Sequence, residues 1–220
     1  SKYFGPDDRD IDSLNSKKWK KRKDKALKQT FDTAAELLEV QAKRNGRVGF
    51  AFDIDEKEFS SFVSKFPYEE TYDQKKTIEE VTTDMQSKQP MDRLICGEVG
   101  FGKTEVAMRA AFIAALNNKQ TCILVPTTLL AAQHFASFEK RFQDSGISIA
   151  ALSRNITLKE KEKLLQDLGS GEIDIVIGTH ALLQGNIRFN DLGLLIIDEE
   201  HRFGVRQKEK IKTLKEEVEI

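Results

Sequence analysis

After residue 71 the sequence alternates short apolar runs with stretches that have the spacing of amphipathic helices, and this alternation constrains the fold more than any other feature. Runs that are apolar on both faces and are separated by helices are typical of a parallel sheet covered by helices on both faces. Ligands bind to such sheets beyond the carboxyl ends of the strands. We therefore predict an α/β fold with functional residues directly after the strands. The predicted strands span residues 94–96, 121–125, 147–151, 173–177 and 192–197, and the helices between them span 106–116, 129–142 and 158–168.

The N-terminal third has a different pattern. Residues 17–44 contain no proline or glycine and carry apolar side chains at helical spacing, which predicts one helix of about 42 Å at ~1.5 Å per residue. A second, short helix is predicted over residues 55–66, where Asp55 is the N-cap and Pro67 stops the helix. We therefore expect a helical linker over residues 1–65 and one α/β lobe over residues 66–220.

The composition excludes several classes of protein. Among 220 residues, 39% are hydrophobic and 32% are charged, and no run approaches the roughly 18 apolar residues of a membrane helix. No signal peptide is recognisable, so we expect a cytoplasmic protein that has no membrane partner. Cys96 and Cys122 both lie in apolar runs, which predicts buried, reduced thiols. The chain starts at Ser1 and stops in a charged stretch, so we expect a piece of a longer protein.

The net charge of −1 hides an asymmetry. Residues 17–28 contain eight basic residues and one acid and contribute +7, which leaves −8 for the remainder. Such a tract fits either direct contact with nucleic acid or a solvated connector helix, and the pattern favours the connector.

A phosphate-binding loop is predicted after the run at residues 94–96. The next eight residues match the pattern G-x-x-x-x-G-K-[ST] between a strand and a helix. In such loops backbone N–H groups converge on phosphate oxygens, Lys103 would neutralise the phosphates, and the Thr104 hydroxyl would bind Mg²⁺. A tight turn would explain the glycines but not Lys103 and Thr104 together. The residues predicted to bind ATP here are Gly97, Glu98, Val99, Gly100, Phe101, Gly102, Lys103, Thr104 and Glu105.

Two acids at the end of the run at residues 192–197 form the second predicted site. Asp198 would hold Mg²⁺ with Thr104, and Glu199 would orient and deprotonate the attacking water. An acidic strand end alone is more often an exposed turn, but the phosphate loop upstream favours phosphoryl transfer. Lys103 completes the predicted catalytic set. The histidines, whose spacing disfavours a zinc site, are His134, His180 and His201.

The order of the motifs resembles that of the first RecA-like lobe of superfamily-two helicases and translocases, which are P-loop NTPases. Residues 91–107 and 201–208 are similar to the transcription-repair coupling factors (the Mfd family) and to the RecG-like branched-DNA helicases. Trp19 with residues 34–44, and residues 66–74, resemble the coupling factors in particular. The ordered motifs are the phosphate loop, Pro126-Thr127-Thr128-Leu129-Leu130, Gly178-Thr179-His180 and Asp198-Glu199-Glu200-His201.

The resemblance implies an ATP-driven translocase of double-stranded DNA. The intact protein would displace stalled RNA polymerase, which it would bind through a domain upstream of this chain, and would recruit excision-repair proteins. Gln74 would read the adenine edge, with Phe66 or Tyr68 beside the base, although Tyr72 stands where the family usually has proline. The residues that map to DNA-backbone contacts are Pro126, Thr127, Thr128, Thr179 and His180.

Other interpretations of these residues remain open. The family's second lobe should follow Ile220 and supply arginines worth about 10³ to 10⁵ in rate, so the resemblance implies that this chain alone binds ATP weakly and hydrolyses it hardly at all. A RecG-like lobe is one alternative, and a nucleotide-gated interaction module without catalysis is another. From the residues alone, Gln74 could be an exposed helix residue, and the threonines could be helix caps.

Overall fold

The computed structural model describes residues 17–46, 48–98, 100–153, 156–185, 187–204, 207–208, 210–211, 214 and 218–220. The chain divides into two compact units, Ser1–Lys43 and Arg44–Ile220. The described residues of the first unit, 17–43, all belong to helix α1 (Lys17–Asn45), whose length agrees closely with the helix expected from the sequence. Leu27, Phe31 and Leu38 on this helix are exposed.

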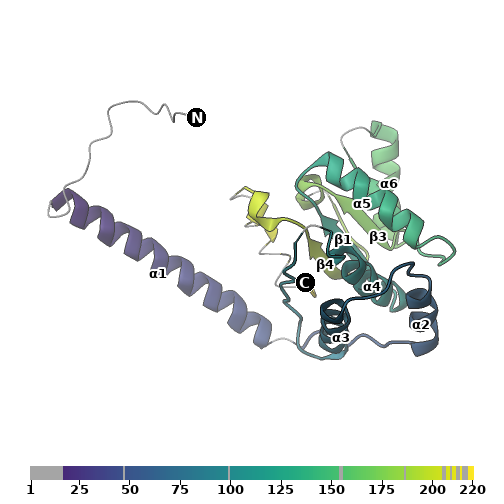
Figure 1. Cartoon of the computed structure of the whole chain (residues 1–220). Helices are drawn as coiled ribbons and strands as arrows, with labels where there is room; N and C mark the ends of the chain where they lie inside the picture. The colour runs from purple at the N-terminus through teal and green to yellow at the C-terminus, as the bar shows by residue number, and fades with distance from the viewer. Residues whose placement is uncertain are drawn as a thin grey trace, which may run out of the picture. The chain divides into compact units, whose positions relative to one another are not determined.

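A four-stranded parallel sheet forms the centre of the second unit (Figure 1). Its spatial order is β2-β3-β1-β4, so β1 is an inner strand paired with both β3 and β4. Because the strands are parallel, their carboxyl ends lie at one edge, where Leu124 of β1 is level with Gly178 of β3 and Ile197 of β4. The strands are β1 (Gln120–Leu124), β2 (Ile149–Leu152), β3 (Ile175–Gly178) and β4 (Leu192–Ile197).

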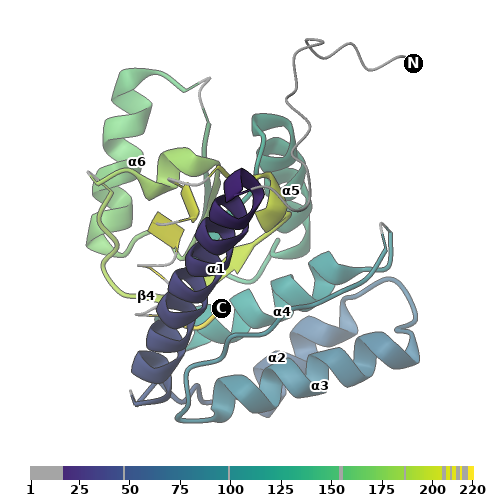
Figure 2. The same ribbon diagram turned by 90° about the vertical axis from the view of Figure 1, so that its left-hand side faces the viewer.

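Helices cover both faces of the sheet, which confirms the predicted α/β class. Successive residues of a strand face opposite sides, so Ile123 packs with α4 and α5 while Cys122 packs with α6. Helix α3 packs along α4 (Figure 2). The helices of this unit are α2 (Glu56–Ser64), α3 (Tyr72–Gln86), α4 (Lys103–Leu116), α5 (Thr128–Arg141) and α6 (Leu158–Ser170), with short 3₁₀ helices η1 (His180–Leu183) and η2 (Glu200–Arg202).

The second unit begins at Arg44, whereas the sequence placed the boundary after residue 65. Helix α2 explains the difference, because its Phe62 is 4% exposed and stacks on Phe112 of α4 with ring centroids 4.1 Å apart. No helix in the described part of the chain is long and apolar enough to cross a membrane.

The predicted strand at residues 94–96 does not form. Residues 218–220 lie beside β4 and hydrogen-bond residues 91 and 93: the N–H of Arg93 donates to the carbonyl oxygen of Ile220 at 3.0 Å. This pairing stops at Arg93, and a strand requires paired backbone groups. Cys96 is therefore exposed, contrary to the prediction, whereas Cys122 is buried in β1 as expected.

Candidate functional site

The phosphate loop ends in a left-handed glycine that begins α4. Gly102 is the N-cap of α4 with a φ of 72°, and a side chain there would also collide with the amide of Gln74. Glycine is the residue that adopts this conformation at little cost. The loop therefore delivers Lys103 and Thr104 to the first turn of α4, where free N–H groups favour anions. Val99, also predicted to bind ATP, lies outside the described residues.

The Lys103 ammonium is bound by the loop itself. Its Nζ donates to the carbonyl oxygens of Gly97 at 2.5 Å and Glu98 at 2.9 Å. The N–H of Phe101 donates to the Glu98 carbonyl at 3.4 Å, which closes the turn. An ammonium has three N–H donors, so one remains for a phosphate oxygen, and further phosphate contacts would replace these carbonyl partners.

Asp198 follows β4 at the same edge of the sheet. Its N–H donates to the carbonyl oxygen of Leu124 at 2.9 Å, which holds its backbone against β1. His134 Nε2 lies 3.1 Å from Asp198 Oδ2. This hydrogen bond, aided by the charge of Lys103, lowers the pKa of Asp198 against the opposing effect of partial burial. Asp198 is therefore an ionised carboxylate at neutral pH.

Glu199 has an unusual backbone. Its φ of 52° and ψ of 49° lie in the left-handed region, which costs a non-glycine residue about 1 to 3 kcal/mol. Its carboxylate oxygen Oε2 is 3.0 Å from Arg202 Nε. The strained residue turns the chain sharply after β4 and into η2, and such strain is concentrated at functional sites.

The oxygen donors at this edge fit Mg²⁺. Mg²⁺ binds through one or two carboxylates with hydroxyl, water and phosphate oxygens, and Thr104 and Asp198 supply a hydroxyl and an ionised carboxylate. Among the described residues, no group of three or more His, Cys, Asp or Glu side chains could hold a metal ion. His134 instead contacts Asp198, an arrangement that the sequence spacing does not reveal.

Gln74 joins α3 to the phosphate loop. Its Oε1 accepts from the N–H of Thr71 at 2.8 Å in a capping box, and its Nε2 donates to the carbonyl oxygen of Phe101 at 2.9 Å. Both polar atoms of the amide are thus engaged. An adenine edge would use the second N–H of Nε2 and the second lone pair of Oε1, or would replace one of these partners.

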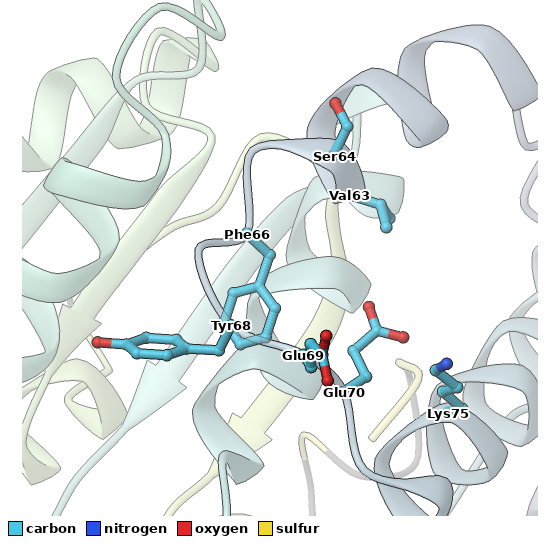
Figure 3. A pocket seen from close by; sticks show the side chains of 7 residues that line it. All are labelled: Val63, Ser64, Phe66, Tyr68, Glu69, Glu70 and Lys75. Atoms are coloured by element: carbon cyan, nitrogen blue, oxygen red, sulfur yellow. The ribbon is translucent and has the colours of Figure 1, made fainter.

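Phe66 and Tyr68 line a pocket of about 530 Å³ beside α3. Their rings are 5.6 Å apart in an edge-on arrangement. Figure 3 shows these rings on one side of the pocket and Glu70 and Lys75 on the other. The lining residues all lie between positions 63 and 75, so the pocket is built by the end of α2, by the loop between α2 and α3, and by the start of α3.

The Glu105 side chain lies away from the phosphate loop. It is 6% exposed, and its Oε1 accepts from Arg109 Nε at 2.9 Å and from Arg141 Nη2 at 2.8 Å. Arg109 also forms an ion pair with Glu70. The carboxylate of Glu105 therefore serves this buried ionic network, and its part in the predicted ATP set is limited to the backbone of the first helical turn.

The predicted DNA contacts follow two neighbouring strands. Pro126, Thr127 and Thr128 follow β1, and the Thr127 hydroxyl caps α5 by accepting from the N–H of Leu130 at 3.2 Å. Thr179 and His180 follow β3, but Thr179 is only 3% exposed. The fold thus brings the two segments together at one edge, with His180 half-buried and the Thr179 side chain covered.

Comparison with known proteins agrees with this geometry. Residues 71–219 match the family model described as DEAD/DEAH box helicase. The chain is 53% identical to the transcription-repair-coupling factor of Haemophilus influenzae and 48% identical to that of Escherichia coli. Each match covers the whole of this chain but only 19% of the relative, so the chain spans about a fifth of these proteins.

Two solved structures have the same fold. The structure of RecG bound to a three-way DNA junction is 40% identical, with a TM-score of 0.71 over 76% of this chain and 23% of that one. A hypothetical ATP-dependent RNA helicase from Sulfolobus tokodaii has a TM-score of 0.55 at 18% identity, over 74% of this chain and 49% of that one. Because the family model spans the phosphate loop, the parallel sheet and the acidic end of β4, the chain belongs to the DEAD/DEAH box helicase family.

Proposed function

We propose that this chain is the ATP-binding first lobe of a motor that moves along double-stranded DNA. Membership of the family implies ATP binding. The observation that carries the proposal is the meeting of two motifs 95 residues apart: α4, which begins at Lys103, packs against β4, which ends just before Asp198. The charge of Lys103 also helps to lower the pKa of Asp198. A cation beside an ionised carboxylate at the carboxyl edge of a parallel sheet is the arrangement that phosphoryl transfer requires.

Each residue has a separate task. Lys103 and the free N–H groups of the first turn of α4 bind the phosphates, and Thr104 and Asp198 would hold Mg²⁺, which supplies neutralisation of phosphate charge. Glu199 orients the attacking water and accepts its proton. Gln74 reads the adenine edge through its amide, beside Phe66.

DNA would lie along the same edge of the sheet. The polar segments after β1 and β3 can bind backbone phosphates through hydroxyl and N–H groups, which grip DNA without reading its sequence. The best candidates are the exposed residues Thr127 and Thr128, because Thr179 is covered. Closure of this lobe on a second one would convert ATP hydrolysis into steps along the duplex.

In a longer protein this motor would couple transcription to DNA repair. The support is the similarity over the whole chain to transcription-repair-coupling factors at 53% and 48% identity. Such a protein would displace stalled RNA polymerase and recruit nucleotide excision repair through domains outside this chain.

The chain alone should bind ATP weakly and hydrolyse it slowly. Lys103 and Gln74 already hydrogen-bond protein atoms, which leaves each of them fewer donors for a nucleotide. Arginines contributed from a second lobe are typically worth about 10³ to 10⁵ in rate. Rapid turnover by the 220-residue chain, stimulated by DNA, would contradict this part of the proposal.

A nucleotide titration tests the proposed function. A fluorescent ATP analogue is titrated into the wild-type chain, into Lys103→Ala, and into Lys163→Ala as a control for an exposed lysine on α6. Lys103→Ala should weaken binding at least tenfold, and Lys163→Ala should not change it. Equal affinity for all three proteins would overturn the proposal.

A branched-DNA helicase is the second candidate, which the 40% identity to RecG favours. The two candidates differ in DNA preference. Binding of this chain to a three-way junction much more tightly than to a linear duplex of the same length would support the RecG-like function, and equal binding would support the duplex translocase.

A further inference from the structure

His134 contacts Asp198 from a different element of the fold. It lies in the middle of α5, 64 positions before Asp198 in the sequence, and its Nε2 is 3.1 Å from Asp198 Oδ2. The side chains are 16% and 34% exposed, so the contact is partly shielded from bulk water. An ionised carboxylate can only accept hydrogen bonds, so His134 Nε2 is the donor.

Both partners are fixed by their surroundings. The His134 ring lies 6.4 Å from the ring of Phe138, which is fully buried one turn further along α5. Asp198 is fixed through its N–H, which donates to the carbonyl oxygen of Leu124 in β1. A hydrogen bond between two such anchored groups holds the carboxylate in one orientation, which a surface pair would not do.

We propose that His134 is a positioning residue that orients Asp198 for Mg²⁺. By binding Oδ2 it sets the orientation in which the carboxylate meets the ion or its bound water. Outer partners of this kind fix the orientation of metal-binding groups, and their loss typically costs about 10-fold to 100-fold in metal affinity. The inference rests on the proposed function, in which Asp198 holds the metal.

Three substitutions separate positioning from packing. His134→Gln keeps an N–H donor at about the reach of Nε2, whereas His134→Asn is too short to reach Asp198, and His134→Leu fills the space without a donor. Gln133→Leu is the matched control, because Gln133 is the exposed neighbour of His134 on α5. Circular dichroism and thermal unfolding of each variant establish that it is folded.

The measurement is the binding of a fluorescent ATP analogue to the 220-residue chain, first in EDTA and then during a Mg²⁺ titration. We expect His134→Leu and His134→Asn to raise the Mg²⁺ concentration that gives half of the Mg²⁺-dependent change in nucleotide binding about 10-fold or more. Their nucleotide affinity in EDTA should be unchanged. His134→Gln and Gln133→Leu should stay within about threefold of wild type. Should His134→Leu fail to fold, His134→Asn provides the same comparison.

Two results would overturn the inference. One is a wild-type Mg²⁺ dependence in folded His134→Leu or His134→Asn. The other is a loss in folded His134→Gln as large as that in His134→Asn, because the hydrogen bond would then be irrelevant. Lys103→Ala distinguishes a failure of this inference from a failure of the proposed function. If Lys103→Ala leaves nucleotide affinity unchanged, the proposed function itself fails. If it weakens binding while the His134 variants behave as wild type, only this inference fails.

Discussion

At the residue scale, groups that would contact a nucleotide are already bound to protein atoms. Lys103 donates to two loop carbonyls, and the Gln74 amide bridges Thr71 and Phe101. Exchange of one hydrogen bond for another contributes little net free energy. Where a nucleotide group replaces one of these partners instead of using a remaining donor or acceptor, the net gain in binding free energy is therefore small.

A substitution of Gly102 tests whether nucleotide binding needs the close approach of the phosphate loop to Gln74. Gly102→Ala would place a side chain in a left-handed residue and against the amide of Gln74. We expect at least a tenfold loss of nucleotide affinity in the fluorescence titration, because the loop must move to relieve the collision. Gly146→Ala is the control, since Gly146 has a similar φ of 73° with nothing within 4 Å of the added carbon. If Gly102→Ala bound nucleotide as well as this control, nucleotide binding would not depend on the close approach of Gly102 to Gln74.

The two cysteines give a second residue-scale prediction. Cys122 is buried in β1, and burial raises its pKa to about 12, so it remains a protonated, unreactive thiol at neutral pH. Cys96 is exposed. A thiol reagent at pH 7.5 should modify one thiol in the native chain and two in denaturant. Modification of neither thiol in the native chain would show that residues 94–96 are buried after all.

At the element scale, a buried ionic network joins α4 and α5 to each other and to α2. Glu105 accepts hydrogen bonds from Arg109 and Arg141, and the Arg141 guanidinium lies 3.9 Å from the centroid of the Phe62 ring. Arg141 Nη2 also donates to the carbonyl oxygen of Phe62 at 3.0 Å. The phosphate-loop helix is thereby fixed to its neighbours directly behind Thr104.

Removal of Arg141 should be costly. Its side chain is 9% exposed and that of Glu105 is 6% exposed, so Arg141→Met leaves a buried carboxylate with fewer partners. Losing one partner of a buried pair typically costs about 3 to 5 kcal/mol. Urea unfolding measures the change, with Lys140→Met on the exposed face of α5 as the control, expected within about 0.5 kcal/mol of wild type. Equal stabilities would mean that Arg141 contributes nothing through this network.

The elements differ in how well the sequence predicts them. Four of the five predicted strands form within two residues of their expected limits, because each has a neighbour to complete its hydrogen bonds. The run at residues 94–96 has the same apolar character but no such partner beyond Arg93. The contacts of His134 with Asp198 and of Arg141 with Glu105 join residues 64 and 36 positions apart. No local periodicity encodes such contacts, so only the fold reveals them.

The salt dependence of DNA binding shows whether the basic tract on α1 contacts DNA. Lys20, Lys21 and Lys23 are exposed, and we expect them to belong to a connector rather than to a DNA-binding surface. Changing all three to glutamine should therefore leave duplex affinity within about twofold of wild type. If these lysines bound DNA, the change would instead reduce the slope of log affinity against log salt by ~0.9 for each phosphate that is no longer neutralised. Lys159→Gln with Lys163→Gln on α6 is the charge control.

At the scale of the whole molecule, one edge of the sheet gathers the proposed ATP and DNA residues. Asp198 follows β4, Thr127 follows β1 and His180 follows β3, and these strands are consecutive in the sheet. The sequence outside the basic tract carries −8. A general positive field cannot attract DNA to such a surface, so affinity must come from locally placed groups at this edge.

Two truncated proteins test where the α/β unit begins, which is Arg44 in the structure and residue 66 in the prediction from the sequence. The buried apolar residues of the described chain run from Phe52 to Val218, so a protein of residues 44–220 should keep the thermal midpoint and nucleotide affinity of the full chain. A protein of residues 66–220 loses α2 and with it Phe62, which stacks on Phe112. Loss of a buried phenylalanine typically costs about 3 to 5 kcal/mol, so this shorter protein should melt several degrees lower. Equal midpoints for the two proteins would show that α2 belongs to the linker, as the sequence alone suggested.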